Sequence, residues 1–116
     1  NERIKEITDT VPINCHVIDA KGMYVTPGLI DVHVHGSCGA DTMDQTVEVI
    51  ELISQGIAKN GVTSFLPTTM TMSREDIYGA LDIVRDCMHQ TLNGAKVLGA
   101  HLLMRFIKVL NPNDIL

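Results

Sequence analysis

The sequence predicts an α/β fold in which strands and helices alternate as β-α-β-α-β. Apolar and polar residues alternate with a period of two in the segment 27–36, and short apolar strand patterns return at 62–68 and 96–103. Between these runs, around 47–58 and 74–88, apolar residues recur at helical spacing instead. Connections of this length indicate parallel strands joined by right-handed crossovers. A small doubly wound sheet and the opening of a (β/α)8 barrel both satisfy this order, and the pattern does not separate them.

The residues before this run predict short strands only. We expect strands at Glu2–Ile7, His16–Ala20 and Met23–Val25, with a proline interruption at Val11-Pro12 and a turn at Lys21-Gly22. None of these pieces carries recognisable chemistry. The single histidine among them, His16, is interpreted as structural or exposed.

The segment 27–36 is the most informative of the chain. Its apolar residues point to one face and its polar residues to the other: Ile30, Val32 and Val34 on the first, Asp31, His33 and His35 on the second. Histidines at i and i+2 lie side by side, about 6.6–7 Å apart along a strand, and can close on one metal ion. Because glycines follow directly, we expect this pair at the carboxyl end of a parallel strand.

Each predicted helix has a capping residue before its apolar stripe. The first stripe is preceded by Asp44 or Thr46 as candidate cap and followed by Gly61 at the helix end, and it consists of Val47, Ile50, Ile53, Ile57 and Ala58. We expect its isoleucines to bury against the apolar face of the histidine strand. The second helix begins with a capping-box pattern at Ser73–Asp76, and its stripe is Ile77, Leu81, Val84 and Met88. Asn93-Gly94 closes it, a strand follows at Lys96–Leu103, and residues 104–116 either extend that strand or cover an edge.

Composition narrows the class of function. The 116 residues are 45% apolar with a formal charge of −5 and contain no Trp, so we expect a globular protein without a nucleic-acid partner. No apolar run has the length of a membrane span, and no signal peptide precedes the first charged residues. The cysteines Cys15, Cys38 and Cys87 match no disulfide scaffold or zinc motif. Reduced thiols and a cytoplasmic location are the expectation.

Four blocks in order carry a family resemblance. Pro27–Gly36, Gly39–Asp44, Leu66–Thr69 and Leu98–Leu102 resemble the N-acetylglucosamine-6-phosphate deacetylase family of the amidohydrolase superfamily. The resemblance extends over roughly Glu2–Leu102 and favours the barrel. It implies that residues 1–26 are part of a small β domain, and that residues 27–116 are the first β/α units of an incomplete TIM-like metal-dependent hydrolase barrel.

The resemblance also implies a reaction and a cofactor. The family hydrolyses the acetamido group of an amino-sugar phosphate, giving glucosamine 6-phosphate and acetate. His33 and His35 are the candidate metal ligands, and neutral imidazole suits zinc best, with iron as an alternative. A divalent ion of this kind lowers the pKa of bound water and polarises a carbonyl, which amide hydrolysis needs. Asp31 shares the histidines' face and is a candidate to orient His33 by a hydrogen bond.

The third strand departs from the family pattern. The family has a metal-binding Glu where this chain has Leu103, which carries no ligating atom. His101 points the same way and is a candidate substitute or pocket residue, and Thr68 and Thr69 are candidate pocket residues. The family's later metal histidines, its proton-handling Asp and its sugar-phosphate contacts would lie beyond Leu116. No catalytic residue is therefore assigned, and the 116 residues alone are expected to be inactive.

Three functions remain open at this point. The first is the deacetylase, the second is another amidohydrolase such as a cyclic-amide hydrolase, and the third is a truncated, non-catalytic domain. The expected partner of the enzyme is a small amino-sugar phosphate. The open sheet edges of three parallel strands predict a homo-oligomer or dependence on a missing C-terminal part.

Overall fold

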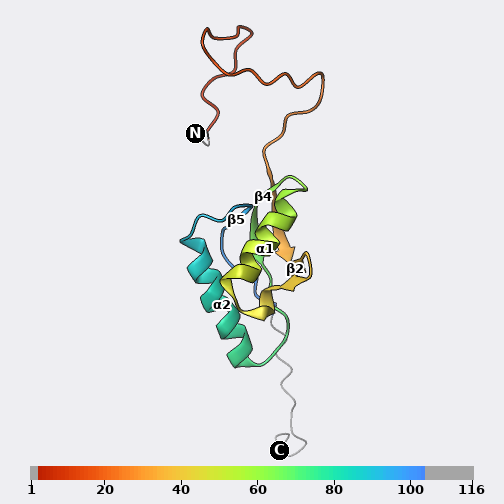
Figure 1. The fold of residues 1–116 in the computed structure, drawn as a ribbon, viewed down its shortest axis with the longest axis vertical. Helices are drawn as coiled ribbons and strands as arrows, with labels where there is room; N and C mark the ends of the chain where they lie inside the picture. The colour runs from red at the N-terminus through yellow and green to blue at the C-terminus, as the bar shows by residue number, and fades with distance from the viewer. Residues whose placement is uncertain (1–2, 104–116) are drawn as a thin grey trace, which may run out of the picture.

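The structure, a computed structural model, describes residues 3–103 of the chain (Figure 1). Its elements in order are β1 (Leu29–Val34), β2 (Gly36–Ser37), β3 (Ala40–Asp41), the short 3-10 helix η1 (Thr42–Asp44), α1 (Val47–Ala58), β4 (Val62–Pro67), α2 (Arg74–Met88) and β5 (Lys96–Val97). Apart from the small β2–β3 hairpin, this is the predicted β-α-β-α-β order.

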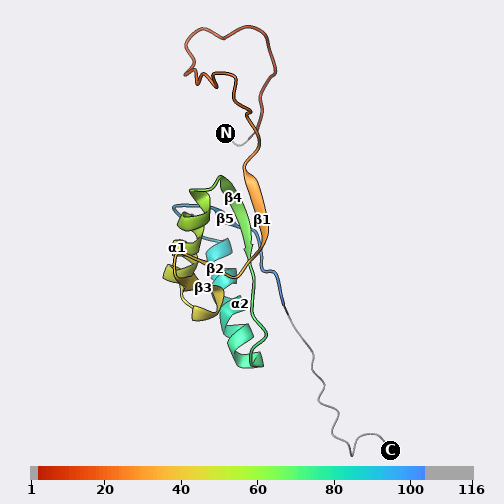
Figure 2. The ribbon, with the colours of Figure 1, turned by 90° about the vertical axis from the view of Figure 1, so that its right-hand side faces the viewer.

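The main sheet has three parallel strands in the order β1-β4-β5. The two helices lie on the same side of it, with α1 packed on β4 and α2 packed on β5 and on α1 (Figure 2). The predicted parallel pairing is thereby confirmed. Since all three strands run the same way, their carboxyl ends meet at one edge of the sheet.

Helix α1 forms the centre of the core. Thr46 caps it by accepting a hydrogen bond from the backbone N of Val49, and Gly61 follows with the left-handed φ of 83° that the sequence predicts there. Asp44 belongs to η1 instead. Three isoleucines of α1 pack with Phe65, Val84 and Val97 in the buried cluster: Ile50, Ile53 and Ile57.

Helix α2 buries a slightly different stripe from the predicted one. Ser73 caps the helix as expected, and its hydroxyl bonds to Asp76. The buried side chains are Ile77, Ala80, Val84 and Cys87. Met88 is 40% exposed, so its assignment to the core is wrong. Cys87 and Met88 are three and four residues after Val84, so helical spacing permits either, and the packing of α2 against β5 and α1 buries Cys87.

The apolar face of β1 is only partly buried. Val34 packs against the core cluster, but Ile30 and Val32 are each 59% exposed. Strand β1 lies at the edge of the sheet while α1 crosses β4, and the register of β1 against β4 shifts between Asp31 and Val34. The expected contact of the α1 isoleucines with the whole face of β1 is therefore limited to its carboxyl end.

Two groups of predicted strands differ from the structure. No strand occurs among residues 3–28, because a strand needs a hydrogen-bonded neighbour and residues 3–103 offer these segments none. The third strand of the sheet stops at Val97, and His101 forms only an isolated bridge with Thr68. The prediction for residues 104–116 lies outside the described residues. Within residues 3–103, no helix combines the length and apolar character that a membrane span requires.

Candidate metal centre

The candidate site residues gather at the carboxyl edge of the sheet. His33 is the penultimate residue of β1 and His35 follows the strand, while Thr68 comes directly after β4. His101, beyond β5, is brought beside Thr68 by their bridge. Residues from three separate parts of the sequence thus meet at the edge where the sequence predicts the site.

The two histidines of β1 point their Nε2 atoms at each other. The distance between His33 Nε2 and His35 Nε2 is 3.2 Å. Two imidazole nitrogens bound to one tetrahedral zinc ion, each about 2.0–2.1 Å from it, lie about 3.3 Å apart. The spacing of this pair therefore fits two ligands of a single ion.

His35 is held at both its ring and its backbone. Its Nδ1 lies 3.2 Å from the carbonyl O of Thr68. Its own carbonyl O accepts hydrogen bonds from the backbone N and the Oγ1 of Thr42, at 2.7 and 2.8 Å. The sequence pattern does not single out Thr42, although this residue belongs to the Gly39–Asp44 block. A threonine after a glycine loop gives no signal by itself, because the turn that brings it back to His35 is not visible in the spacing.

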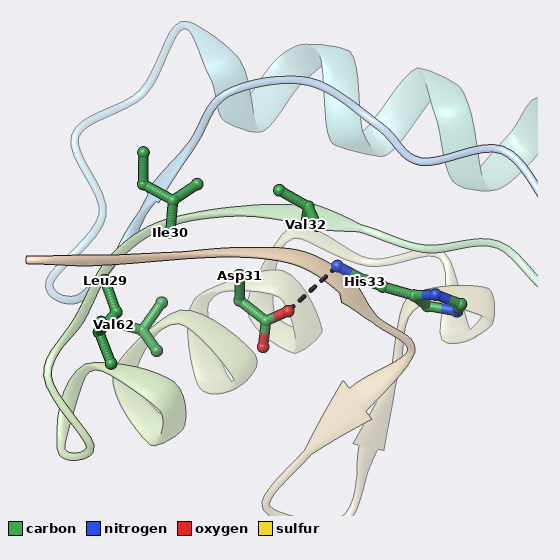
Figure 3. Close-up of a pocket in the computed structure, with 6 residues that line it drawn as sticks. All are labelled: Leu29, Ile30, Asp31, Val32, His33 and Val62. Carbon is green, nitrogen blue, oxygen red and sulfur yellow. Dashed lines mark hydrogen bonds between the residues drawn. The ribbon is translucent and has the colours of Figure 1, made fainter.

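Asp31 plays a different part from the expected one. Its Oδ1 accepts a hydrogen bond from the backbone N of His33 at 3.0 Å, and the imidazole of His33 points away from the carboxylate (Figure 3). Asp31 therefore braces the strand next to His33 but does not contact its ring. Both residues line a surface groove of about 340 Å³ along β1, together with Leu29, Ile30, Val32 and Val62.

The ring of His101 lies against the ring of His33. The two rings meet edge to face, with centroids 4.7 Å apart. The Nδ1 of His101 is buried and has no hydrogen-bond partner among the described residues. Within residues 3–103, however, no three His, Cys, Asp or Glu side chains are placed to hold one ion together. The structure thus fits two of the ligands a metal needs, and His101 does not supply a third in this arrangement.

The threonines after β4 are committed to the backbone. Thr68 Oγ1 accepts from the backbone N of Val34 at 3.0 Å and donates to the carbonyl O of Leu66 at 3.2 Å. Thr69 Oγ1 accepts from the backbone N of Leu103 at 3.1 Å. Both threonines are fully buried, so they support the strand ends and do not expose hydroxyls to a pocket.

The parallel α/β sheet carries the histidine pair at its carboxyl edge, which is where (β/α)8-barrel enzymes place their active sites. The family model described as "Amidohydrolase family" matches residues 24–111. The chain therefore belongs to the amidohydrolase family.

Individual relatives show which members of this family the chain resembles. The chain is 42% identical over 79 residues to N-acetylglucosamine-6-phosphate deacetylase of Bacillus subtilis, a match that covers 66% of this chain and 20% of that protein. It is 46% identical over 76 residues to the enzyme of the same name from Vibrio furnissii, covering 66% of this chain and 19% of that protein. The solved structure of N-acetylglucosamine-6-phosphate deacetylase from Pasteurella multocida superposes with a TM-score of 0.70 at 34% identity, covering 79% of this chain and 24% of that one. The chain spans about a fifth of the length of the curated relatives it matches.

Proposed function

We propose that this chain is part of a metal-dependent deacetylase that hydrolyses the acetamido group of N-acetylglucosamine 6-phosphate. In this proposal His33 and His35 bind the divalent ion, which is zinc or alternatively iron. The observation that carries it is the 3.2 Å spacing of the two Nε2 atoms at the carboxyl edge of a parallel sheet. The names of the similar proteins support the substrate class.

The ion and each of the residues around it have separate roles in the proposed site. The ion, when bound, supplies an activated water and polarises the amide carbonyl. His33 and His35 contribute neutral nitrogen donors, and Asp31 holds the strand that carries them. In this proposal the later metal histidines, the proton-handling carboxylate and the contacts to the sugar phosphate come from residues outside these 116, while the family's metal-binding Glu is replaced by Leu103.

The proposal extends to the organisation of the protein. Residues 27–116 contribute the first β/α units of a barrel, and residues 1–26 contribute to a small β domain. The apolar side chains of residues 3–28 are exposed in the structure, Ile7 and Tyr24 by more than nine-tenths, and a neighbouring sheet would cover them. A cytoplasmic location agrees with the free state of all three cysteines.

Metal binding is tested first, on the full chain. Zinc is titrated into the wild-type chain and into a His33→Ala, His35→Ala double variant, followed by calorimetry. The control is a His16→Ala, His89→Ala double variant, because both of these histidines are exposed and outside the cluster. Loss of binding in the first variant and retention in the second is expected. Equal affinity in all three proteins would refute the assignment.

The activity is tested in a chimera, because the 116 residues alone are expected to release no acetate. Residues 24–103 replace the matching segment of the Bacillus subtilis deacetylase, with either Leu103 or Leu103→Glu. Because Leu103 provides no ligand, we expect the Leu103 chimera to release acetate from N-acetylglucosamine 6-phosphate more slowly than the Leu103→Glu chimera. Neither chimera should release acetate when His33→Ala and His35→Ala are added. A folded Leu103→Glu chimera that never exceeds the metal-stripped control would contradict the proposed function.

A further inference from the structure

We propose that Thr42 and Thr68 are positioning residues that hold His35 in one orientation and in one tautomer, with the proton on Nδ1. The inference rests on the proposed function, because it takes His35 to be a metal ligand. It adds that the site is built asymmetrically, with His35 fixed before any ion arrives.

The ring of His35 is oriented by a backbone carbonyl. A carbonyl O only accepts hydrogen bonds, so the contact between His35 Nδ1 and Thr68 O requires the proton to be on Nδ1. The Nε2 of the same neutral ring then carries a free lone pair. This lone pair faces His33 Nε2 at 3.2 Å, so His33 must donate from Nε2 in the metal-free protein.

The backbone of His35 is fixed by Thr42. His35 follows β1, beyond the last strand residue, and therefore lacks a ladder partner of its own. The β2–β3 hairpin turns the chain back so that both the N and the Oγ1 of Thr42 bond to the carbonyl O of His35. Thr42 is 1% exposed, which shields these two bonds from water. A carbonyl that accepts two buried hydrogen bonds has little freedom to turn.

Thr68 is itself tied to the strand that carries the histidines. Its backbone N donates to the carbonyl O of Val34 at 2.8 Å, and its Oγ1 accepts from the N of Val34 at 3.0 Å. The carbonyl of Thr68 is therefore held at a fixed place relative to His35. The ring of His33, in contrast, contacts the rings of His35 and His101. The two ligands thus differ in what supports them.

The tautomers are measured directly on the metal-free chain. Nitrogen-15 shifts and two-bond proton–nitrogen correlations of the histidine rings distinguish Nδ1–H from Nε2–H. They are recorded at about pH 8.5, where imidazoles are ordinarily neutral. We expect Nδ1–H for His35 and Nε2–H for His33. Nε2–H at His35 would overturn the proposal without reference to any variant or metal.

The contribution of Thr42 is measured with variants of similar shape. Thr42→Val removes the hydroxyl and keeps the backbone hydrogen bond, and Thr42→Ser keeps the hydroxyl. Loss of a group that orients a metal ligand typically weakens metal binding about 10–100-fold. We expect Thr42→Val to bind zinc about tenfold more weakly than the wild type, and Thr42→Ser to bind it as the wild type does.

A matched control separates positioning from general stability. Ser54 Oγ donates to the carbonyl O of Ala95 at 2.8 Å and is fully buried, but this bond lies outside the histidine cluster. Ser54→Ala should lower the melting temperature as Thr42→Val does and leave zinc affinity unchanged. If the wild type binds zinc and Thr42→Val binds it equally well, the positioning role fails. If the wild type binds no zinc, the proposed function fails, while the tautomer measurement still decides the orientation of His35.

Discussion

A single methyl group added at Gly56 should separate the β2–β3 hairpin from α1. Gly56 lies within α1, and a Cβ built there would come 2.6 Å from Cys38 Sγ and 2.7 Å from Ser37 Oγ. Both atoms are one bond from the Cβ atoms of the hairpin, and Ser37 Cβ itself would lie 3.4 Å from the new methyl group, so the contact involves the hairpin and not only side-chain ends. The hairpin joins His35 to Thr42, and a displacement here therefore reaches the candidate metal site.

Two opposing contributions determine how much Gly56→Ala changes the free energy of unfolding. Replacing Gly by Ala in a helix interior stabilises by about 1 kcal/mol. Forcing an extra methyl group into a packed contact costs about 1–3 kcal/mol. Gly56→Ala should therefore destabilise the chain by up to about 2 kcal/mol.

Gly79 in α2 provides the matched comparison. The Cβ of Gly79→Ala would meet the amide end of Gln45, a long side chain that can turn aside. Gly79→Ala should keep most of the stabilisation that alanine gives a helix interior relative to glycine, about 1 kcal/mol. The two variants should thus melt at least about 4 °C apart, with Gly56→Ala the lower.

Thermal unfolding followed by circular dichroism measures this difference. Adding Cys38→Ala to Gly56→Ala removes the sulfur and should recover part of the loss, whereas Cys38→Ala in the wild type should not stabilise by the same amount. A Gly56→Ala protein as stable as Gly79→Ala would show that the hairpin does not pack against α1 as described.

Three further outcomes are expected. Ile53 is fully buried, so Ile53→Asp should leave the chain unfolded or insoluble, whereas Leu52→Asp, 43% exposed on the same helix, should fold; an unchanged melting curve for Ile53→Asp would mean that the helix face is assigned wrongly. A hydrogen bond from Gln55 holds the pKa of Glu51 below its usual range. Ionised Glu51 therefore stabilises the fold at pH values above its unfolded pKa, and this stabilisation is lost as the pH falls through the folded pKa. The free energy of unfolding of Glu51→Gln should accordingly depend less on pH in the acid range than that of the wild type. Burial raises the pKa of the Cys87 thiol, and nearby carboxylates raise it further, so iodoacetamide at pH 8 should label the two exposed cysteines well before Cys87, as read by peptide mass spectrometry.

Local pattern predicted most of the helices and the strand order. Thr46 and Ser73 cap the helices, and Gly61 adopts the left-handed conformation expected at a helix end. These features depend on residues within one turn of each other, and the sequence displays them directly. The alternation of strand and helix likewise restricts the sheet to parallel strands.

The sequence-based predictions are wrong where contacts between residues far apart in the sequence determine the structure. Strand patterns in residues 3–28 formed no strands, because a pattern of period two supplies no hydrogen-bonded partner. The core face of α2 includes Cys87 in place of Met88, because the contacts of α2 with α1 and β5 select which residues of the helix are buried. Ile30 and Val32 are exposed for the related reason that β1 is an edge strand.

The sequence by itself determined that His33 and His35 share a strand face, and tertiary structure decided what surrounds them. A period of two fixes the side of a strand on which a residue lies. It does not fix which other segments arrive there, and Thr42, Thr68 and His101 reach the pair only through the hairpin turn and the strand pairing. The bonds to Thr42, seven positions away, require the turn of the β2–β3 hairpin, and the contact with Thr68, 33 positions away, requires β1 to pair with β4.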